Sequence, residues 1–375
     1  MVISLKWEQV NAWRLSQQGL SHRLQRGELV QAVRQTIGIH AQLMSAAEMS
    51  IGARMDGISP QDVQSALWQE HTLVKTWVMR QTLHLIPATD FPIYIAARRL
   101  TDINWPALFN RYGINRAVFE TYLAISPEIL NNGPLTRQQF TGLVGERLNS
   151  PELRDFLTKH SWGTPLKPLA WHGELCCGPN IGQNVTFVRP SAWIGAWREM
   201  DPEAAMQEVV RRYLMVYGPA RPRNFQWWWW MSSRAAKKAF DSIADETEEV
   251  DVEGWRSTAL KASVLAMLEL EPTGEVHLLP SFDAYTVGLA RGKNLERLIT
   301  LEHQKKVYRL QGWVSAVVLV DGFIKGTWEY KVQRSKTTVT VDLFSSISNK
   351  VKEGIANEAA RLGKFLNTTV QLEFK

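Results

Sequence analysis

Groups of helical segments followed by a short β-hairpin recur along this chain, and that order limits the folds it can adopt. Helix starts are marked by capping residues, as where Ser59 precedes Pro60 at the first position of a helix. Hairpins are indicated by β-branched, apolar runs on both sides of a turn such as Met79-Arg80-Gln81. In the first group we expect helices at 7–18, 29–36, 46–55 and 60–69, and hairpin strands at 72–78 and 82–86.

The same order returns twice, each time behind a Gly-Pro pair. In the second group Thr136 is expected to cap a helix, and the hairpin covers 174–188 and turns at 178–180. In the third group we expect a helix at 233–243 and strands at 249–252 and 255–260. A phenylalanine follows the Gly-Pro pair at the same spacing in both copies, which indicates an internal repeat, carried by Gly133-Pro134 with Phe140 and by Gly218-Pro219 with Phe225.

Helices followed by a two-stranded hairpin describe a winged helix, a module that usually meets DNA. The alternative of a protein-binding or purely architectural winged helix stays open. From residue 276 the pattern becomes β-rich, with strands at 312–320, 323–332 and 337–344, a turn at Asp321-Gly322, and a closing helix at 349–366. The expected fold class is therefore α+β: three tandem winged-helix modules at 1–100, 101–200 and 201–270, then a C-terminal β-rich module at 271–375.

Composition is that of an ordinary folded protein, with 45% hydrophobic and 21% charged residues in 375. The first residues have no signal-peptide character, and the most apolar run, 313–320, is far shorter than the roughly 20 residues of a membrane span. Two adjacent cysteines, Cys176 and Cys177, suit a reducing compartment, so we expect a cytoplasmic protein. The net charge of +6 permits a polyanionic partner, and paired basic residues strengthen that expectation: Arg98-Arg99, Arg211-Arg212, Arg221 with Arg223, Arg234 with Lys237-Lys238, and Lys305-Lys306 with Arg309.

Several chemistries find no support in the sequence. Phosphate-cradling loops, dinucleotide glycine fingerprints and nucleophile elbows are missing, which argues against nucleotide hydrolysis and hydride transfer. His172-Gly173-Glu174 invites comparison with zinc deaminases, but these need two spaced downstream cysteines, and Cys176-Cys177 is adjacent and too close. We therefore expect no metal and no organic cofactor.

Four consecutive tryptophans at 227–230 are a further unusual feature. Successive residues of a helix point in different directions, so four indoles cannot all lie on one buried face. At least one should be exposed or only partly covered. Two interpretations stay open: a packing seam between modules, or a surface on which bases stack.

An ordered set of motifs extends over nearly the whole chain. The motifs are Val10-Asn11-Ala12-Trp13-Arg14, Ile37-Gly38-Ile39-His40-Ala41-Gln42, Thr76-Trp77-Val78-Met79-Arg80-Gln81-Thr82-Leu83-His84-Leu85, Gly178-Pro179, Asn184-Val185-Thr186-Phe187-Val188-Arg189-Pro190 and Gln311-Gly312-Trp313. Together they resemble the winged-helix DNA glycosylases of the AlkZ and YcaQ type. The resemblance implies three tandem winged helices lining a basic concave cleft, hydrolysis of N7-alkylated purines in duplex DNA, and unhooking of interstrand crosslinks.

The family's catalytic signature is glutamine, a hydrophobic residue, then glutamine or aspartate, and it maps onto His40-Ala41-Gln42 with histidine in place of the first glutamine. Gly38 favours an extended segment, in which residues two apart share a side, so His40 and Gln42 are expected to point together into the cleft. Gln42 would position water, and His40, with an ordinary pKa near 6.5, would accept its proton or polarise it. Without the family context, an ordinary loop with a solvated histidine is the alternative.

DNA contacts are expected from two hairpins and one arginine. A crosslinked base cannot be extruded freely, so a hairpin must reach the lesion, and the candidates are the turn from Gly178 to Asn184 and the turn Asp321-Gly322. Arg80 is the best candidate for a phosphate contact, with a structural ion pair as the alternative. The other function kept open is a non-catalytic DNA binder such as a transcriptional regulator. Regulators are usually dimers, and with no evident dimer element this chain is expected to be a monomer.

Overall fold

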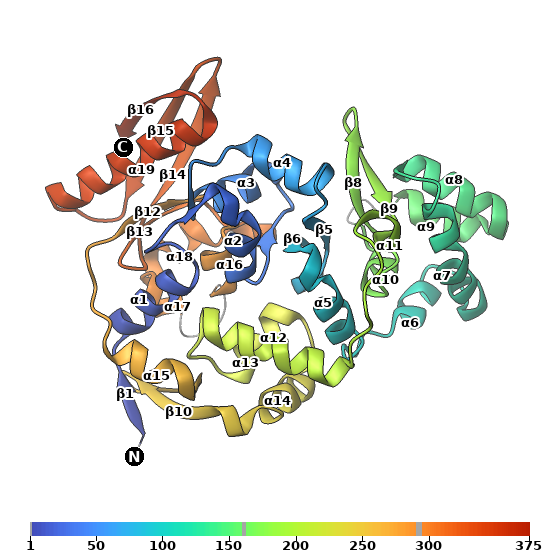
Figure 1. Cartoon of the computed structure of the whole chain (residues 1–375), viewed down its shortest axis with the longest axis horizontal. Helices are drawn as coiled ribbons and strands as arrows, with labels where there is room; N and C mark the ends of the chain where they lie inside the picture. Colours follow the sequence, from blue (N-terminus) through green and yellow to red (C-terminus); the bar gives the residue numbers. More distant parts are fainter. Residues whose placement is uncertain (1, 160–162, 290–294) are drawn as a thin grey trace.

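The computed structural model describes residues 2–159, 163–289 and 295–375 and shows the mixed α+β architecture expected from the sequence (Figure 1). We call the parts of the chain within 2–100, 101–200 and 201–270 the first, second and third unit. In Figure 1 most of the first unit lies centrally, the second unit lies to its right, the third lies below it, and the C-terminal sheet lies at the upper left. No helix among the described residues combines the length and the apolar character needed to cross a bilayer.

The four helices and the hairpin expected in the first unit all form, with α3 beginning two residues early. Ser59 precedes α4 with the reciprocal hydrogen bonds of a capping box, as the Ser-Pro pair indicated. The elements are β1 (Ile3–Leu5), α1 (Trp7–Gln17), β2 (Leu24–Gln25), α2 (Leu29–Gln35), β3 (Ile39–His40), α3 (Met44–Gly52), β4 (Met55–Asp56), α4 (Pro60–Trp68), β5 (Leu73–Trp77), β6 (Leu83–Pro87) and α5 (Phe91–Arg98).

In the second unit Thr136 caps α8 as expected, but the hairpin turn expected at 178–180 is wrong. Those residues belong to a strand whose register shifts between Gly178 and Ile181, and the strands connect at 182–183. Gly178 serves a close approach instead, because a Cβ there would lie 2.7 Å from Thr186 Oγ1. The elements are α6 (Trp105–Asn110), α7 (Arg116–Leu130), β7 (Leu135–Thr136), α8 (Arg137–Leu148), α9 (Pro151–Lys159), α10 (Lys167–Trp171), β8 (Cys176–Ile181), β9 (Asn184–Val188) and α11 (Pro190–Trp193).

The third unit has the expected helix and hairpin, and β1 from the start of the chain joins its sheet as a parallel edge strand. Its elements are α12 (Pro202–Tyr217), α13 (Pro222–Trp229), α14 (Ser233–Asp241), β10 (Thr247–Val252), β11 (Trp255–Leu260) and α15 (Lys261–Leu268).

The three units share one strand pairing. A short segment between two helices pairs antiparallel with the second strand of the hairpin: β3 with β6, β7 with β9, and Ala220 with Thr258 of β11. Phe140 and Phe225, which mark the repeat in the sequence, are both fully buried. The repeat in sequence is therefore also a repeat in topology.

The C-terminal module is a five-stranded sheet in the order β12-β13-β14-β15-β16, packed against α19. The sequence indicated its three central strands and the helix but missed both edge strands, and the strand expected from 312 begins only at Val317. The elements are β12 (Val276–Leu279), α16 (Ala284–Gly288), α17 (Leu295–Leu298), α18 (Leu301–Val307), β13 (Val317–Val320), β14 (Phe323–Gln333), β15 (Lys336–Leu343), α19 (Asn349–Leu366) and β16 (Thr369–Phe374).

Two buried arginines join the units. Arg54 of the first unit forms a fully buried, two-pronged ion pair with Asp283 of the C-terminal module, at 2.7 and 2.8 Å. Arg98 at the end of α5 donates a hydrogen bond to the Val78 carbonyl. Its guanidinium lies 4.4 Å from the ring centre of Trp171 in the second unit and 4.0 Å from that of Trp229 in the third.

Several of the basic pairs seen in the sequence are thus structural. Arg98 is buried, and Arg211 and Arg212 form ion pairs with Glu246 and with Asp90. Clustering in sequence therefore overstates the positive charge that a DNA molecule would meet.

Candidate active site and nucleic-acid interface

The segment that carries His40-Ala41-Gln42 is extended, as the preceding glycine suggested. Gly38 has φ +106°, and a Cβ there would lie 2.6 Å from Met79 Cε, so only glycine fits without displacing its neighbours. His40 ends strand β3 opposite His84, and the Ala41 amide donates to the Leu83 carbonyl at 2.7 Å. Ala41 is fully buried and anchors the motif in the core.

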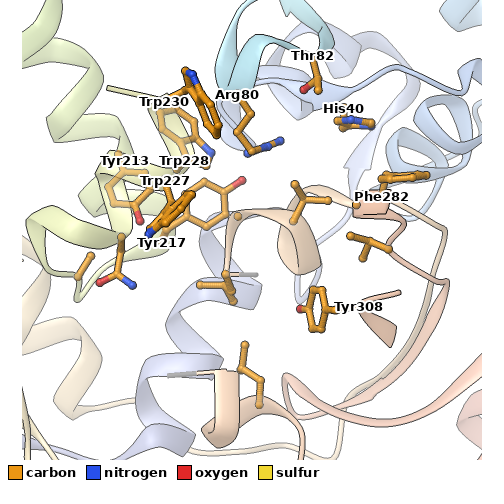
Figure 2. Close-up of a pocket in the computed structure, with 18 of the residues that line it drawn as sticks. His40, Arg80, Thr82, Tyr213, Tyr217, Trp227, Trp228, Trp230, Phe282 and Tyr308 are labelled. Carbon is orange, nitrogen blue, oxygen red and sulfur yellow. The ribbon is translucent and has the colours of Figure 1, made fainter. Parts of the chain in front are cut away.

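His40 lines a cavity of about 450 Å³, the His40 cavity, whose wall includes Arg80, Trp227, Trp230, Phe282 and Trp313 (Figure 2). Its ring stacks on Phe282, with centroids 4.8 Å apart and planes 17° apart, and meets the edge of His84 at 5.5 Å. Among the described residues no hydrogen-bond partner lies within reach of its buried Nδ1 atom. Nε2 is therefore the ring nitrogen left to meet water or substrate.

The environment of His40 keeps its imidazole uncharged. Burial lowers the pKa of His40 from 6.5 to about 3, and the nearby positive charge of Arg80 acts in the same direction. The ordinary pKa assumed from sequence is therefore wrong for this site. A neutral ring with so low a pKa is a weak base, and its chemistry is that of a hydrogen-bonding group.

Gln42 lies on the other side of the motif. Its side chain is exposed, and its Oε1 accepts a hydrogen bond from the Leu83 amide at 3.4 Å. It lines a second cavity of about 760 Å³, the Gln42 cavity, whose wall also includes Leu83, Arg154 and Asn184. His40 and Gln42 were expected to share one groove. Instead each lines its own cavity, because β3 ends at His40 and the backbone turns before α3 begins.

A chain of hydrogen bonds orients Arg80. Arg80 occupies the hairpin turn with φ +50°, and its Nη2 donates to His84 Nε2 at 3.2 Å. His84 Nδ1 in turn donates to the Thr82 carbonyl at 2.9 Å, which assigns the neutral tautomer with hydrogen on Nδ1. Burial, followed by the charge of Arg80, lowers the pKa of His84 well below its ordinary value. Figure 2 shows Arg80 between Trp230 and His40 at the cavity wall.

The four tryptophans are not all buried, as their spacing predicted. Trp228 and Trp229 pack in the core, Trp230 is 44% exposed, and the His40 cavity is lined by Trp227, Trp228 and Trp230. Trp230 also ends α13 in a left-handed conformation, φ +69°. The buried pair is consistent with a packing seam between modules, and the exposed indole of Trp230 is consistent with a surface on which bases stack.

Sequence reasoning missed Phe282 and the neighbouring turn at 309–313. Trp313 meets Phe282 edge to face at 5.0 Å and is 40% exposed. Leu310, at the tip of the turn, is 91% exposed beside Arg309. The turn had one signal in the sequence, the family-like motif Gln311-Gly312-Trp313. Phe282 had none, because it reaches His40 only through tertiary packing.

Of the other residues expected to contact DNA, Asn184 is exposed, whereas Asp321 and Gly322 are engaged in hydrogen bonds within the protein. Asn184 begins β9 near the tip of the β8–β9 hairpin, is exposed, and lines the Gln42 cavity. Asp321 accepts hydrogen bonds from the amides of Gly274 and Glu275 at 2.8 and 3.0 Å. Gly322 is buried, and its carbonyl accepts from Tyr285 Oη at 3.0 Å. These contacts favour a structural role for Asp321 and Gly322, and we leave both out of the proposed DNA interface.

The described residues contain no cluster of three or more His, Cys, Asp or Glu side chains able to hold a metal ion. His172, the residue compared with the zinc deaminases, donates through Nδ1 to the Pro168 carbonyl at 2.7 Å.

Comparisons with known proteins agree over almost the full length. Residues 33–365 match the family described as DNA glycosylase AlkZ-like. An "Interstrand DNA cross-link repair glycosylase" from Streptomyces sahachiroi is 33% identical in an alignment of 367 residues that covers 96% of each chain. The solved structure of Streptomyces sahachiroi DNA glycosylase AlkZ superposes with a TM-score of 0.86 at 31% identity, covering 99% of this chain and 100% of that one. The resemblance seen in the motifs is thereby confirmed, and this chain belongs to the AlkZ-like family of DNA glycosylases.

Proposed function

We propose that this enzyme hydrolyses the N-glycosidic bond of N7-alkylated purines in duplex DNA, including purines held in interstrand crosslinks. The observation that carries the proposal is the extended His40-Ala41-Gln42 segment, which places an uncharged imidazole at a cavity wall in a chain of this family. The name of the 33% identical relative supports the crosslink as a substrate.

The chemistry asks little of the enzyme. Alkylation at N7 makes the purine cationic, so it departs without a general acid, and the barrier lies in the oxocarbenium-like sugar and the delivery of water. The C1′–N9 bond breaks with its electron pair leaving on the purine. Water adds its hydroxyl to C1′, and its remaining proton passes to solvent.

His40 and Gln42 would hold that water together. We place the deoxyribose over the ridge between the two cavities, where Leu83 hydrogen-bonds Gln42 and Thr82 lines the His40 cavity. His40 then approaches the water from one side and the Gln42 carboxamide from the other. The pKa of about 3 supports a role for His40 in orienting water, with proton removal by solvent.

The DNA would lie against three winged helices that form a concave cleft. The support is the strand pairing that all three units share, each with a short strand antiparallel to the second hairpin strand. Arg80 would contact a phosphate beside the lesion, and the β8–β9 hairpin with Asn184 would reach the duplex. Exposed Arg154 supplies positive charge at the Gln42 cavity. We further propose that the enzyme acts as a monomer in the cytoplasm.

Base release tests the proposal directly. Duplex DNA containing 7-methylguanine is incubated with excess enzyme, and free base is measured by mass spectrometry. Wild type should release the base, whereas His40→Ala and Gln42→Ala should each slow release by about 10²-fold, the lower end for one positioned catalytic group. The matched control is His22→Ala, since His22 is exposed and lines neither cavity. DNA binding without release by the wild type would favour the alternative, a winged-helix regulator.

Crosslink activity needs its own substrate. A duplex joined through two guanine N7 atoms should be unhooked into a faster-migrating strand on a denaturing gel. A wild-type enzyme that releases 7-methylguanine but leaves this duplex intact would restrict the proposal to monoadducts.

A further inference from the structure

We infer that the His40 cavity contains an anion site, formed by the guanidinium of Arg14 and the hydroxyl of Tyr213, which binds a phosphate-type oxyanion. In Figure 2 Tyr213 lies across the cavity from His40, so this site is separate from the catalytic motif. The site follows from the burial, the charge and the hydrogen-bond donors of the two side chains. Its expected ligand, a phosphodiester of bound DNA, rests on the proposed function.

Arg14 of α1 is a deeply buried cation. It is 3% exposed and lines the cavity. Its Nε and Nη2 atoms donate to the carbonyls of Gly218 and Pro219 at 3.2 and 3.3 Å, but no carboxylate among the described residues forms an ion pair with it. Burial lowers the pKa of the guanidinium. Because a charge removed from water is unfavourable unless an opposite charge pairs with it, an anion in the cavity would stabilise this arrangement.

The hydrogen-bond donors of this site are Arg14 Nη1 and Tyr213 Oη. Neither atom has a hydrogen-bond partner in the described part of the chain, and both side chains line the cavity. Burial raises the pKa of Tyr213 and the nearby charge of Arg14 opposes this shift, so the hydroxyl keeps its proton and can donate. Since Nη1 carries two hydrogens, the two groups together offer three donors to one acceptor.

Both side chains are held in place before a ligand arrives. The Tyr213 ring packs against Phe225 and Trp228, with ring centres 5.1 Å away in each case. The guanidinium of Arg14 is fixed by its two backbone carbonyls and lies 5.7 Å from the ring centre of Trp7. A preformed site loses little conformational entropy when its ligand binds.

The donors of the site favour phosphate among anions. A guanidinium pairs well with oxyanions, because the oxygens of a phosphate accept several N–H groups at once. The chain belongs to a family of DNA glycosylases, so its substrate brings phosphodiesters to the cavity. Inorganic phosphate is the other source of the same chemistry, and the experiments below separate the two.

Thermal unfolding in sodium phosphate and in sodium chloride, at matched ionic strength and without DNA, tests the site. The melting temperature of the wild type should rise with phosphate concentration and level off, because a ligand of the folded state stabilises it. Tyr213→Phe removes only an oxygen atom that hydrogen-bonds to no described residue. It should keep the wild-type melting temperature in chloride and lose most of the rise in phosphate.

Two further variants complete this test. Arg14→Met removes the charge and should show no phosphate-dependent rise, whatever its melting temperature in chloride. The matched control is Tyr112→Phe, because Tyr112 is a 41% exposed tyrosine of the second unit and is absent from the cavity wall. It should show the full wild-type response to phosphate.

Duplexes in which one phosphodiester is replaced by a neutral methylphosphonate identify the source of the anion. Binding is measured by fluorescence anisotropy in phosphate-free buffer. If DNA supplies the anion, the replacement at one position should weaken wild-type binding by about tenfold, as for one hydrogen bond to a charged group, and should have little effect on Tyr213→Phe. If inorganic phosphate supplies it, no position should depend on Tyr213, and the site stands with the other source.

Two outcomes would overturn the inference. One is a wild-type melting temperature that is the same in phosphate and chloride, and the other is an equal rise in wild type and Tyr213→Phe. Neither measurement involves base release, so a failure of the proposed function and a failure of the anion site are distinguishable.

Discussion

Lowering the pH from 7 to 5 should leave His40 uncharged in the folded protein while destabilising the fold. The buried imidazole has a pKa of about 3, compared with 6.5 when it is solvated. Between these values the unfolded chain binds a proton that the folded chain refuses, so protons favour unfolding. The stabilisation is fully present above pH 6.5 and is lost as the pH falls towards 3.

The size of the effect follows from the two pKa values. Each pH unit in this interval changes the free energy of unfolding by about 1.4 kcal/mol per group. At pH 5 the protein is about 1.5 units below the solvated pKa and well above the folded one, so His40 alone should cost about 2 kcal/mol relative to pH 7. His40→Gln removes this titration and keeps a neutral, hydrogen-bonding side chain.

Two measurements check this prediction. In protein labelled with ¹³C at histidine Cε1, the resonance missing from His40→Gln should not move between pH 8 and 4.5. In urea unfolding at pH 7 and pH 5, wild type should lose about 2 kcal/mol more than His40→Gln. His22→Gln is the matched control and should lose as much as the wild type, because His22 is exposed. A His40 resonance that titrates near pH 6.5, or equal losses in wild type and His40→Gln, would refute the reasoning.

Three further predictions concern residues around the motif. Arg80→Gln should weaken binding to all DNA sequences alike and lower the slope of log K against log salt by about one, measured by fluorescence anisotropy from 50 to 200 mM salt; loss of affinity for a single sequence would contradict a phosphate contact. Arg54→Met should destabilise the protein by about 3–5 kcal/mol, because it leaves the Asp283 carboxylate buried without its partner; an unchanged urea midpoint would contradict this. Gly38→Ala should cost about 1–3 kcal/mol and slow base release, because it combines φ +106° with a 2.6 Å approach to Met79 Cε. If Gly38→Ala keeps the wild-type stability and rate of base release, the backbone before His40 accommodates a Cβ and the prediction is wrong.

Local signals were sufficient to predict the three hairpins and some of the helices of this protein, whereas other helices, among them α7 and α12, were not predicted. The Ser59-Pro60 start of α4, the Thr136 cap of α8 and the Asp321-Gly322 turn depend on backbone preferences that a few neighbouring residues determine. The extended backbone at His40 was predictable for the same reason, because Gly38 stands two residues before it.

Features that depend on distant residues were not predictable from one sequence. The edge strand β16 gains its partner only through parallel pairing with β15, and Phe282 reaches His40 through the packing of the C-terminal module on the first unit. The low pKa of His40 and its separation from Gln42 into another cavity follow from burial, which residue types alone do not specify. Gly178 was misread because a glycine beside a proline signals a turn as readily as a close approach.

Arg98 gives the molecule a mechanical link that its topology does not require. Its guanidinium lies between indoles of the second and third units and also holds the Val78 carbonyl, two residues before Arg80. A displacement of either outer unit relative to the first would have to break or shift these contacts. The position of the strand end that precedes the Arg80 turn therefore depends on the packing of all three units.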